Sequence, residues 1–457
     1  MNPQLTQPLH GKVQALMAET GTPGVSVGIL HGGEEYLCGF GVTHIHNPLA
    51  VDGDTLFQIG STSKTVTATV AMRLVEAGKL DLNTPIRHYL PDFHMQDSEA
   101  GERATLRHCF THTGGWLGDY FDDTGDGDDA LAIYVQRMAE LPQQAPLGKL
   151  WSYNNAGFSL AGRVIEAVAG KPFEAVAHEL VLNPLGMDRS FYFARDVMTH
   201  RFAAGHILDP VDPEKKTQIA QPWPLARSAH AAGGVTSSAR DQMRYARFHL
   251  GDGCAADGTR LLSEASMKLM QSPLAEAGSM AEAVGVSWLL GKTGGVRTVA
   301  HGGATNGQMS AFLMVPERKF AITVLTNANR GRELHNALVS WSLNHFLGLK
   351  DPEPTVQSPS PVELAAYAGR YIAHMSHLQV SAEGDRLRVI VTPQSGFPYK
   401  DSPPAPAAPP MTMVFVGKDR LMVADGPQKG GKVEVIRDES GQVAWLRMGG
   451  RVHRRAG

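Results

Sequence analysis

The chain has 457 residues, of which 42% are hydrophobic and 19% charged, a balance that excludes an intrinsically disordered chain. At this length we expect one large globular domain and a smaller one. The 42 Lys and Arg residues nearly cancel the 45 Asp and Glu residues, and the net charge of −3 creates no field that would gather nucleic acid or an anionic membrane. We therefore expect neither of these partners.

The amino-terminal sequence has no basic segment followed by the apolar stretch of a signal peptide, and no run of about 18 apolar residues occurs in the chain. The cysteines, Cys38, Cys109 and Cys254, are odd in number and far apart, which indicates a reducing compartment and neither a disulfide framework nor a zinc cluster. We expect a cytoplasmic protein. Removal of a leader would leave the same sequence, so export stays an alternative.

Strand-like segments stand at both ends of residues 1–349. Residues 24–30 and 34–42, joined by His31-Gly32-Gly33, predict a hairpin with a glycine turn. Near the other end, strands are predicted in residues 301–316, 317–320 and 321–328.

Helical spacing of apolar residues dominates the sequence between these ends. It predicts helices at residues 66–77, at residues 131–141, after Asn155, and at residues 334–347. Strands at both ends with helices between them predict the α+β class, with one central antiparallel sheet flanked by helices.

A proline-rich linker is predicted at residues 350–361, which contain four prolines and few apolar side chains. Beyond it, residues 362–457 hold only short strand-like segments separated by Gly, Asp and Pro, at the spacing of a small β-barrel. Residues 403–410, PPAPAAPP, are too rich in proline for a strand ladder and predict an exposed loop. The predicted domains are therefore 1–349 and an all-β domain at 362–457.

The first motif with chemical meaning is Ser61-Thr62-Ser63-Lys64, where a strand-like segment meets Gly60 and a helix begins. Residues i and i+3 share a helix face, so Lys64 can reach the Ser61 oxygen and act as a base if burial or nearby positive charge keeps it neutral. The helix start also aims backbone N–H groups at an oxyanion. Alone, such a motif also arises by chance.

The second motif is Tyr153-Asn154-Asn155, just before a predicted helix. A phenol beside a cationic Lys can share its proton and act as base and then as acid, and Asn155 offers an amide donor and acceptor to substrate or to Lys64. The alternative is a buried Tyr and an Asn that caps the helix.

The third motif is His301-Gly302-Gly303, which we expect to open the strand pair near residue 310. Glycines at a sheet edge let a substrate approach, and the Ala304 N–H can supply an oxyanion donor. Two other triplets resemble this motif, but we assign neither to the site. His31-Gly32-Gly33 lies in the predicted hairpin turn, and at Lys292-Thr293-Gly294 we expect a tight turn and a solvent-facing Lys.

In this order the three motifs resemble those of the class C β-lactamase and penicillin-binding-protein-like serine hydrolases, a family that includes D-aminopeptidases, DD-peptidases and esterases. The resemblance covers residues ~10 to 347 and includes residues 106–118, LRHCFTHTGGWLG. It implies a sheet with a helical subdomain and, after it, a lipocalin-like barrel. It also implies Ser61 as nucleophile, Lys64 and Tyr153 as the acid/base pair, and a substrate site formed by Asn155, His301, Gly302, Gly303 and Ala304, with the N–H groups of Ser61 and Ala304 as oxyanion hole.

Two features need separate comment: the third motif, which departs from the β-lactamase pattern, and an acidic run with two possible interpretations. A Lys usually grips the substrate carboxylate at the third motif, whereas His301 is mostly neutral at pH 7, so carboxylate recognition is in doubt. The run DYFDDTGDGDD, with six Asp between positions 119 and 129, can attract a cationic substrate amine. We favour the other interpretation, in which Asp128 or Asp129 caps the next helix and the rest is solvated loop.

His108 and His112 stand at i, i+4 spacing, but no Glu or third ligand accompanies them, so we predict no metal and no organic cofactor. The predicted function is a serine hydrolase that acts through an acyl-enzyme on a small peptide or amide, with a D-residue as one possibility. A carboxylesterase or weak β-lactamase, and a penicillin-binding sensor without turnover, are the alternatives. The expected partner is a small molecule or short peptide, and the sequence does not give the oligomeric state.

Overall fold

The largest sheet joins strands from both ends of residues 1–349, in a computed structural model that describes residues 2–209, 216–278, 280–426 and 428–456. All neighbouring strands in it are antiparallel. Their spatial order is β2 (Glu34–Gly41), β1 (Gly24–His31), β13 (Phe320–Thr326), β12 (Met309–Val315), β11 (Val296–Ala304), β10 (Leu289–Thr293), β9 (Ala283–Val284) and β8 (Ala275–Glu276). The central antiparallel sheet and the α+β class are thus confirmed.

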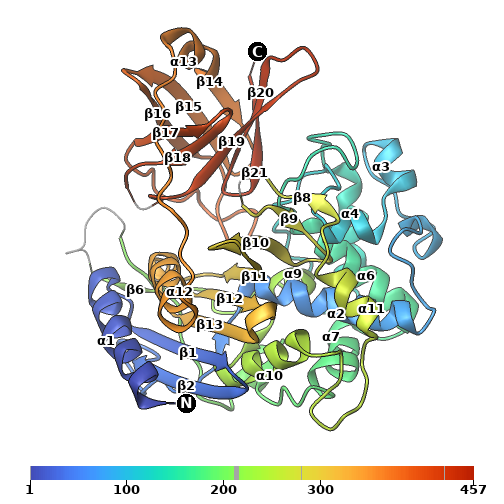
Figure 1. The fold of residues 1–457 in the computed structure, drawn as a ribbon. Helices are drawn as coiled ribbons and strands as arrows, with labels where there is room; N and C mark the ends of the chain where they lie inside the picture. Colours follow the sequence, from blue (N-terminus) through green and yellow to red (C-terminus); the bar gives the residue numbers. More distant parts are fainter. Residues whose placement is uncertain (1, 210–215, 279, 427, 457) are drawn as a thin grey trace.

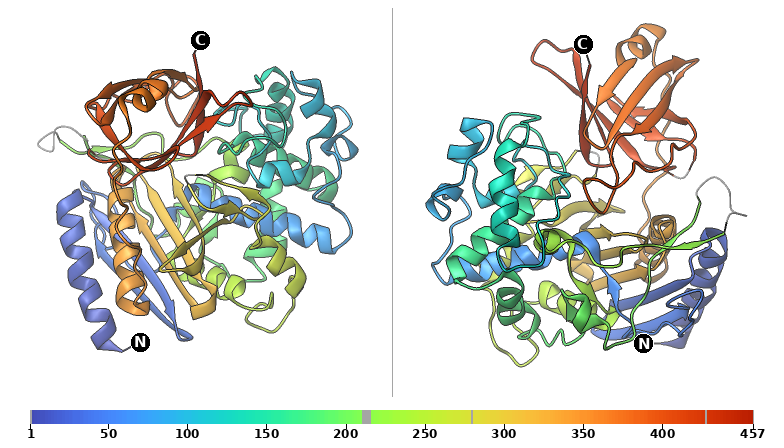
Figure 2. Two further views of the ribbon diagram at one scale, coloured as in Figure 1. Left: turned by 45° about the horizontal axis from the view of Figure 1, so that its top comes forward. Right: turned by 180° about the vertical axis from the view of Figure 1, so that it is seen from behind.

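Two helices from the ends of this segment cover one face of the sheet. α1 (Pro3–Thr20) and α12 (Gly331–Leu347) pack side by side over β1, β12 and β13, and Leu9 and Leu338 are fully buried there (Figures 1 and 2). α10 (Ala239–Leu250) packs on the opposite face, against β1 and β13.

The other elements of this segment are helices, single helical turns and two small sheets. The α-helices are α2 (Ser63–Glu76), α3 (Ser98–Arg103), α4 (Leu106–Phe110), α5 (Ala130–Arg137), α6 (Ala156–Ala169), α7 (Phe173–Ala177), α8 (Ala194–Val197), α9 (His230–Gly233) and α11 (Glu264–Met270). Most of these helices, among them α2, α3, α4, α6 and α7, lie together to the right of the sheet in Figure 1 and form the helical part of the domain. Short 3-10 helices form η1 (Gly60–Thr62), η2 (Ile86–His88), η3 (Met138–Glu140), η5 (Arg227–Ala229) and η6 (Pro316–Arg318), and a short π-helix forms η4 (His178–Leu182). Small sheets contain β3 (Phe57–Gln58), β4 (Ser190–Phe191) and β7 (Thr236–Ser237), and β5 (His206–Ile207) with β6 (Gln218–Ile219).

Most predicted elements are confirmed, and two predicted strands, at residues 301–316 and 317–320, are wrong. Helices form at all four predicted places, as α2, α5 with η3, α6 and α12. The segment 301–316 is not one strand, because residues 305–308 turn between the end of β11 and the start of β12. Residues 316–318 form a turn rather than a strand. His301 therefore lies near the end of a strand that begins at Val296.

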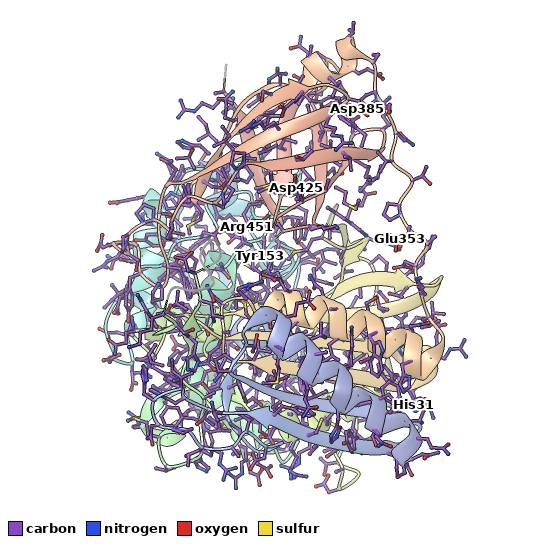
Figure 3. All side chains as sticks on the ribbon, turned by 90° about the vertical axis from the view of Figure 1, so that its left-hand side faces the viewer. His31, Tyr153, Glu353, Asp385, Asp425 and Arg451 are labelled. Atoms are coloured by element: carbon purple, nitrogen blue, oxygen red, sulfur yellow. The ribbon has the colours of Figure 1, made fainter. Side chains whose placement is uncertain are left out.

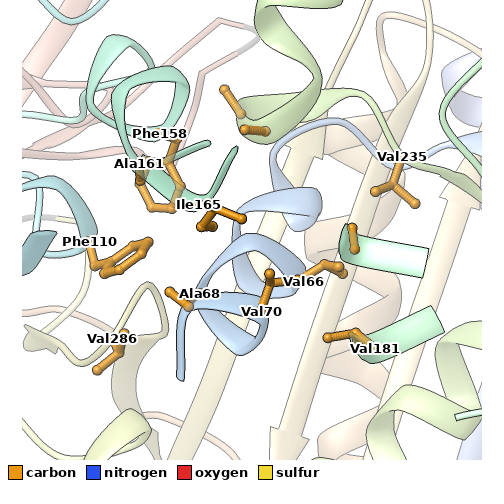
Figure 4. Close-up of a cluster of buried hydrophobic side chains, with 14 of the residues drawn as sticks. Val66, Ala68, Val70, Phe110, Phe158, Ala161, Ile165, Val181, Val235 and Val286 are labelled. Carbon is orange, nitrogen blue, oxygen red and sulfur yellow. The ribbon is translucent and has the colours of Figure 1, made fainter. Parts of the chain in front are cut away.

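Helix α2 runs through the middle of the domain and is buried on nearly every side. Figure 4 shows it surrounded by apolar side chains of neighbouring elements, among them Phe110, Phe158 and Val181. A helix buried in this way must satisfy its polar side chains internally. Thr67 Oγ1 accordingly donates to the Ala231 carbonyl at 2.7 Å, and Lys64, on the same helix, has no exposed surface.

The carboxyl-terminal strands close into a barrel that stands above one end of the sheet (Figure 1). α13 (Pro361–Tyr367) precedes β14 (Gly369–Ile372), β15 (Ser376–Glu383), β16 (Arg386–Pro393), β17 (Met411–Gly417), β18 (Arg420–Val423), β19 (Lys432–Arg437), β20 (Val443–Met448) and β21 (Arg451–Arg455), and β14 pairs with β21. Apolar side chains such as Leu378, Val389 and Leu446 fill its interior. Residues 403–410 form a largely exposed loop, as predicted.

Within the described ranges, no helix is both long enough and apolar enough to cross a bilayer.

A buried ion-pair cluster holds α9 in place beside α2. Glu174 accepts a 2.7 Å hydrogen bond from His230 Nδ1 and a 3.1 Å hydrogen bond from Arg227 Nε. Burial alone would raise the pKa of Glu174, but the hydrogen bonds from His230 and Arg227 outweigh it and lower the pKa to about 2. The cluster matters for the site because α9 includes Ala232, whose carbonyl contacts Lys64.

We predict that Glu174→Gln lowers the free energy of unfolding by roughly 3 kcal/mol at neutral pH, since about two pK units separate the folded carboxyl from an unfolded one. A depressed pKa stabilises the fold above about pH 4.5 and loses that contribution as the pH falls toward about 2. The difference between wild type and variant in urea unfolding should therefore shrink between pH 5 and pH 3. Glu179→Gln, which breaks the exposed pair with Lys171, is the matched control and should change stability by less than about 1 kcal/mol. Equal effects of both variants would contradict the prediction.

Candidate active site

The Ser61 turn is built by two glycines that allow η1 and β11 to meet. Gly60 has φ of +51°, and a Cβ there would lie 2.6 Å from the amide nitrogen of Ala304. A Cβ on Gly303 would lie 1.8 Å from the Ile59 carbonyl oxygen. Ser310 Oγ of β12 donates to that same carbonyl at 2.7 Å and ties the turn to the sheet. The half-buried Ser61 is thereby held beside the end of β11.

Lys64 is the centre of the site's hydrogen bonding. Its Nζ lies 3.0 Å from Ser61 Oγ, 2.7 Å from Asn155 Oδ1 and 2.5 Å from the Ala232 carbonyl oxygen. Burial, followed by the positive charge of Arg451, lowers the pKa of Lys64 well below its usual value. Both effects favour the neutral amine, which is the form that can accept a proton.

The amide of Asn155 has only one orientation that satisfies its neighbours. Its Nδ2 donates to Asp119 Oδ1 at 2.8 Å, and its Oδ1 accepts from Lys64. The pKa of Asp119 is lowered even though burial opposes ionisation, because Arg451 and Asn155 stabilise the carboxylate, which can only accept. Asp119 therefore fixes which end of the amide faces Lys64. Asn155 also stands at the N-cap position of α6 but makes no side-chain cap bond there.

Tyr153 is buried in the site, with His112 and Lys64 as neighbours. Its ring stacks on His112 at 4.4 Å, and Lys64 Nζ lies 5.2 Å from the ring centroid. Burial raises the pKa of Tyr153 to about 12, and hydrogen bonding with Ser61 and the charge of Arg451 only partly oppose this. The phenol thus carries its proton at neutral pH and can donate it.

The third motif supplies shape rather than charge. His301 is buried on β11, and this burial is the main cause that lowers its pKa to about 3; Lys64, when protonated, acts in the same direction. It is therefore neutral at physiological pH and cannot grip a carboxylate as a cation. Gly302, Gly303 and Ala304 follow it along the strand edge beside Ser61. Lys292 is exposed, as expected, and lies 3.2 Å from Glu282. It belongs to strand β10, and the expected turn begins only at Gly294.

The acidic run is a solvated loop only in part, which corrects the favoured interpretation: Asp123, Asp126, Asp128 and Asp129 are exposed, whereas the other two Asp residues are not. Asp119 and Asp122 are buried and pair with residues of the barrel domain: Asp119 with Arg451 at 2.9 Å, and Asp122 with Lys400 at 2.6 Å. Asp129 occupies the cap position of α5 without a side-chain cap bond, and Asp128 pairs with Arg227 at 2.7 Å. The run thus fastens the barrel to the first domain.

Four residues near the motifs had no role in the sequence analysis as site residues: Asp119, His112, Arg332 and Arg451. His112 was weighed only as a metal ligand, and its Nδ1 in fact accepts from the Asn154 N–H at 3.0 Å. His108 hydrogen-bonds Thr105 instead. No group of three or more His, Cys, Asp or Glu residues in the described part of the chain is arranged to hold a metal ion.

We predict that Gly303→Ala destabilises the protein by about 1–3 kcal/mol, because its methyl group would collide with the Ile59 carbonyl and push the Ser61 turn away from β11. Gly302→Ala, one residue earlier on the same strand, is the matched control, since its Cβ would meet only the Ser310 carbonyl at 3.2 Å. Thermal unfolding of both variants measures the difference. Equal melting temperatures would show that the two segments are not in contact.

The comparisons with known proteins agree with this geometry. The profile of the family described as Beta-lactamase matches residues 9–340. Penicillin-binding protein 4 of Amycolatopsis lactamdurans is 34% identical over 369 residues, which cover 79% of this chain and 96% of that protein. The structure of SurE with D-Leu is similar over 100% of both chains, with a TM-score of 0.75 at 24% identity. The D-amino acid amidase of Ochrobactrum anthropi, with L-phenylalanine amide, has a TM-score of 0.61 at 23% identity, covering 74% of this chain and 99% of that one. The last two likenesses show a shared fold.

Proposed function

This chain belongs to the β-lactamase family of serine hydrolases, and from that premise we propose that it hydrolyses an amide or ester bond through an acyl-enzyme on Ser61. The family includes β-lactamases and esterases, so the bond type alone does not name the substrate. The preferred substrate is a small peptide or amide, as for a D-aminopeptidase or DD-peptidase.

The observation that supports the proposal best is the set of partners around Lys64 Nζ. A neutral amine has two N–H donors and one lone pair. The Ala232 carbonyl and Asn155 Oδ1 accept the two donors, which leaves the lone pair for the hydroxyl proton of Ser61. The site therefore matches a base acting on a serine nucleophile.

The protonation states of these residues then assign a role to each of them in the reaction. Ser61 Oγ bonds to the substrate carbonyl carbon while its proton passes to Lys64, and the N–H groups of Ser61 and Ala304 hold the oxyanion. Tyr153 gives its proton to the leaving amine or alcohol as that bond breaks, and Lys64 returns a proton to the phenolate. Water then attacks the acyl-enzyme, and the freed acid departs with Ser61 again protonated.

The substrate preference is supported by an arginine that has no ion pair among the described residues, and by the relatives. Arg332, in the first turn of α12, is exposed, makes no ion pair with any described residue, and acts electrostatically on Tyr153. An anionic group on the substrate would meet it there, in place of the Lys absent from the third motif. Relatives named for penicillin binding, for D-Leu and for D-amino acid amides favour a peptide-like substrate with a D-residue.

We predict that a fluorophosphonate and a penicillin each add one covalent group to the wild-type protein and none to Ser61→Ala, as read by intact-protein mass spectrometry. The same variant should lose at least about a thousandfold in kcat/KM, because the nucleophile is gone. The penicillin adduct should persist, and D-aminoacyl anilides should be cleaved faster than a chromogenic cephalosporin.

Each other outcome rejects part of the proposal. Consumption of penicillin without a lasting adduct would favour a β-lactamase, and preferential cleavage of a short-chain p-nitrophenyl ester would favour a carboxylesterase. Absence of labelling by both reagents would favour a binding protein without turnover.

A further inference from the structure

The barrel domain places a charged side chain inside the active site. Arg451, the first residue of β21, holds Asp119 with two hydrogen bonds, Nε to Oδ2 at 3.0 Å and Nη2 to Oδ1 at 2.9 Å. Its guanidinium also lies 4.6 Å from the centre of the Tyr153 ring. Figure 3 shows Arg451 and Tyr153 next to each other at the junction of the two domains. A residue far from the three motifs in sequence thus contacts Tyr153, one member of the acid/base pair.

This contact is the start of a chain that ends at the nucleophile. Asp119 Oδ1 accepts from Asn155 Nδ2, and Asn155 Oδ1 accepts from Lys64 Nζ, which lies 3.0 Å from Ser61 Oγ. An asparagine amide can turn over and exchange its donor and acceptor ends. With the Asp119 carboxylate held in place by Arg451, only one orientation of Asn155 is satisfied, and that orientation faces an acceptor toward Lys64.

The backbone of the same hairpin fixes the Tyr153 segment. The N–H of Tyr153 donates to the Gly450 carbonyl at 2.8 Å, and the N–H of Val452 donates to Ser152 Oγ at 3.3 Å. Arg447 of β20 donates from Nε to the Trp151 carbonyl at 3.0 Å. The β20–β21 hairpin therefore locks the phenol-bearing segment at three consecutive residues, and Arg451 adds the connection to Asn155 and Lys64.

We propose that Arg451 is a positioning residue through which the barrel completes the active site, holding Asp119 so that Asn155 keeps Lys64 aligned for proton transfer from Ser61. The inference rests on the proposed acyl-enzyme function, since it assigns Arg451 to that reaction. In this arrangement the barrel is part of the catalytic unit rather than an appended module.

The charges around Lys64 determine the direction in which its pKa should move when Arg451 is removed. The charged and titratable groups that face this network are Lys64 of α2, His112 after α4, Asp119, Tyr153, His301 of β11, Arg332 of α12 and His453 of β21. The charge of Arg451 lowers the pKa of both Lys64 and Tyr153, and Asp119 raises both. Loss of Arg451 removes the lowering charge and leaves Asp119 unpaired, so both changes make Lys64 harder to deprotonate.

The test compares the pH dependence of Ser61 acylation by a fluorophosphonate, and of kcat and KM for an uncharged p-nitrophenyl ester, in wild type, Arg451→Gln and Arg451→Lys. Arg451→Gln should slow acylation by about ten- to a hundredfold and move the rising limb of the pH profile upward by about one pH unit. For the ester, the loss should fall on kcat rather than on KM. Arg451→Lys keeps the charge but not the two-pronged grip, so it should restore the pH profile and only part of the rate.

Lys400→Gln is the matched control, because it removes the other ion pair between the barrel and the acidic run, with Asp122, and does not touch the site. It should leave the pH profile at its wild-type position even if it lowers the melting temperature. An unshifted profile in Arg451→Gln, or the same shift in Lys400→Gln, overturns the inference while Ser61 labelling of wild type still upholds the hydrolase. A loss confined to KM also overturns it, since that result assigns Arg451 to substrate binding. Failure of wild type to be labelled would reject the proposed function itself.

Discussion

A lysine amine with no exposed surface is the constraint on which this active site depends. Lys64 lies on a helix that is buried on nearly every side, so its amine must find every partner within the protein. Two fixed acceptors, from α9 and from Asn155, take two N–H groups, and the third direction leads to Ser61. The same burial that makes an ammonium unfavourable here makes the neutral amine a base.

The rest of the fold can be understood as the support for these few contacts. The sheet brings β11 beside the Ser61 turn, and the two glycines at residues 60 and 303 permit that approach. The Glu174 cluster anchors α9, which presents the Ala232 carbonyl. The barrel fixes the Tyr153 segment from the other side. Elements distant in sequence thus support the surroundings of one amine: α9 contacts Lys64 directly, whereas β11 and the barrel hold the neighbouring Ser61 turn and Tyr153 segment.

The sequence was sufficient to predict the local parts of this picture. Ser61 and Lys64 share one turn, so their contact follows from helical spacing, and the chain order of the three motifs was enough to indicate the family. The sheet and the barrel were predictable because the spacing of apolar residues within each short segment distinguishes strands from helices. The strand boundary at His301 was misplaced, because the polar residues 305–308, Thr-Asn-Gly-Gln, form a turn between two strands and the first of these strands already begins at Val296.

The contacts between domains could not be predicted in this way. Asp119 and Asp122 look like parts of a solvated acidic loop until the barrel places Arg451 and Lys400 against them. Nothing near Arg451 in sequence indicates a catalytic setting, since its partner lies in the other domain. The neutral state of His301 was expected from its residue type, but the burial that lowers its pKa to about 3 was not.

The most direct test of the account is the titration of Lys64 itself. In protein labelled with ¹³C at the lysine Cε positions, the resonance that is missing from a Lys64→Met variant reports this one side chain. Because burial and the charge of Arg451 disfavour the ammonium, we expect this resonance to titrate well below the range of the other lysines. Titration of Lys64 together with the exposed lysines, near a pKa of about 10.4, would contradict the account and remove the base from the proposed mechanism.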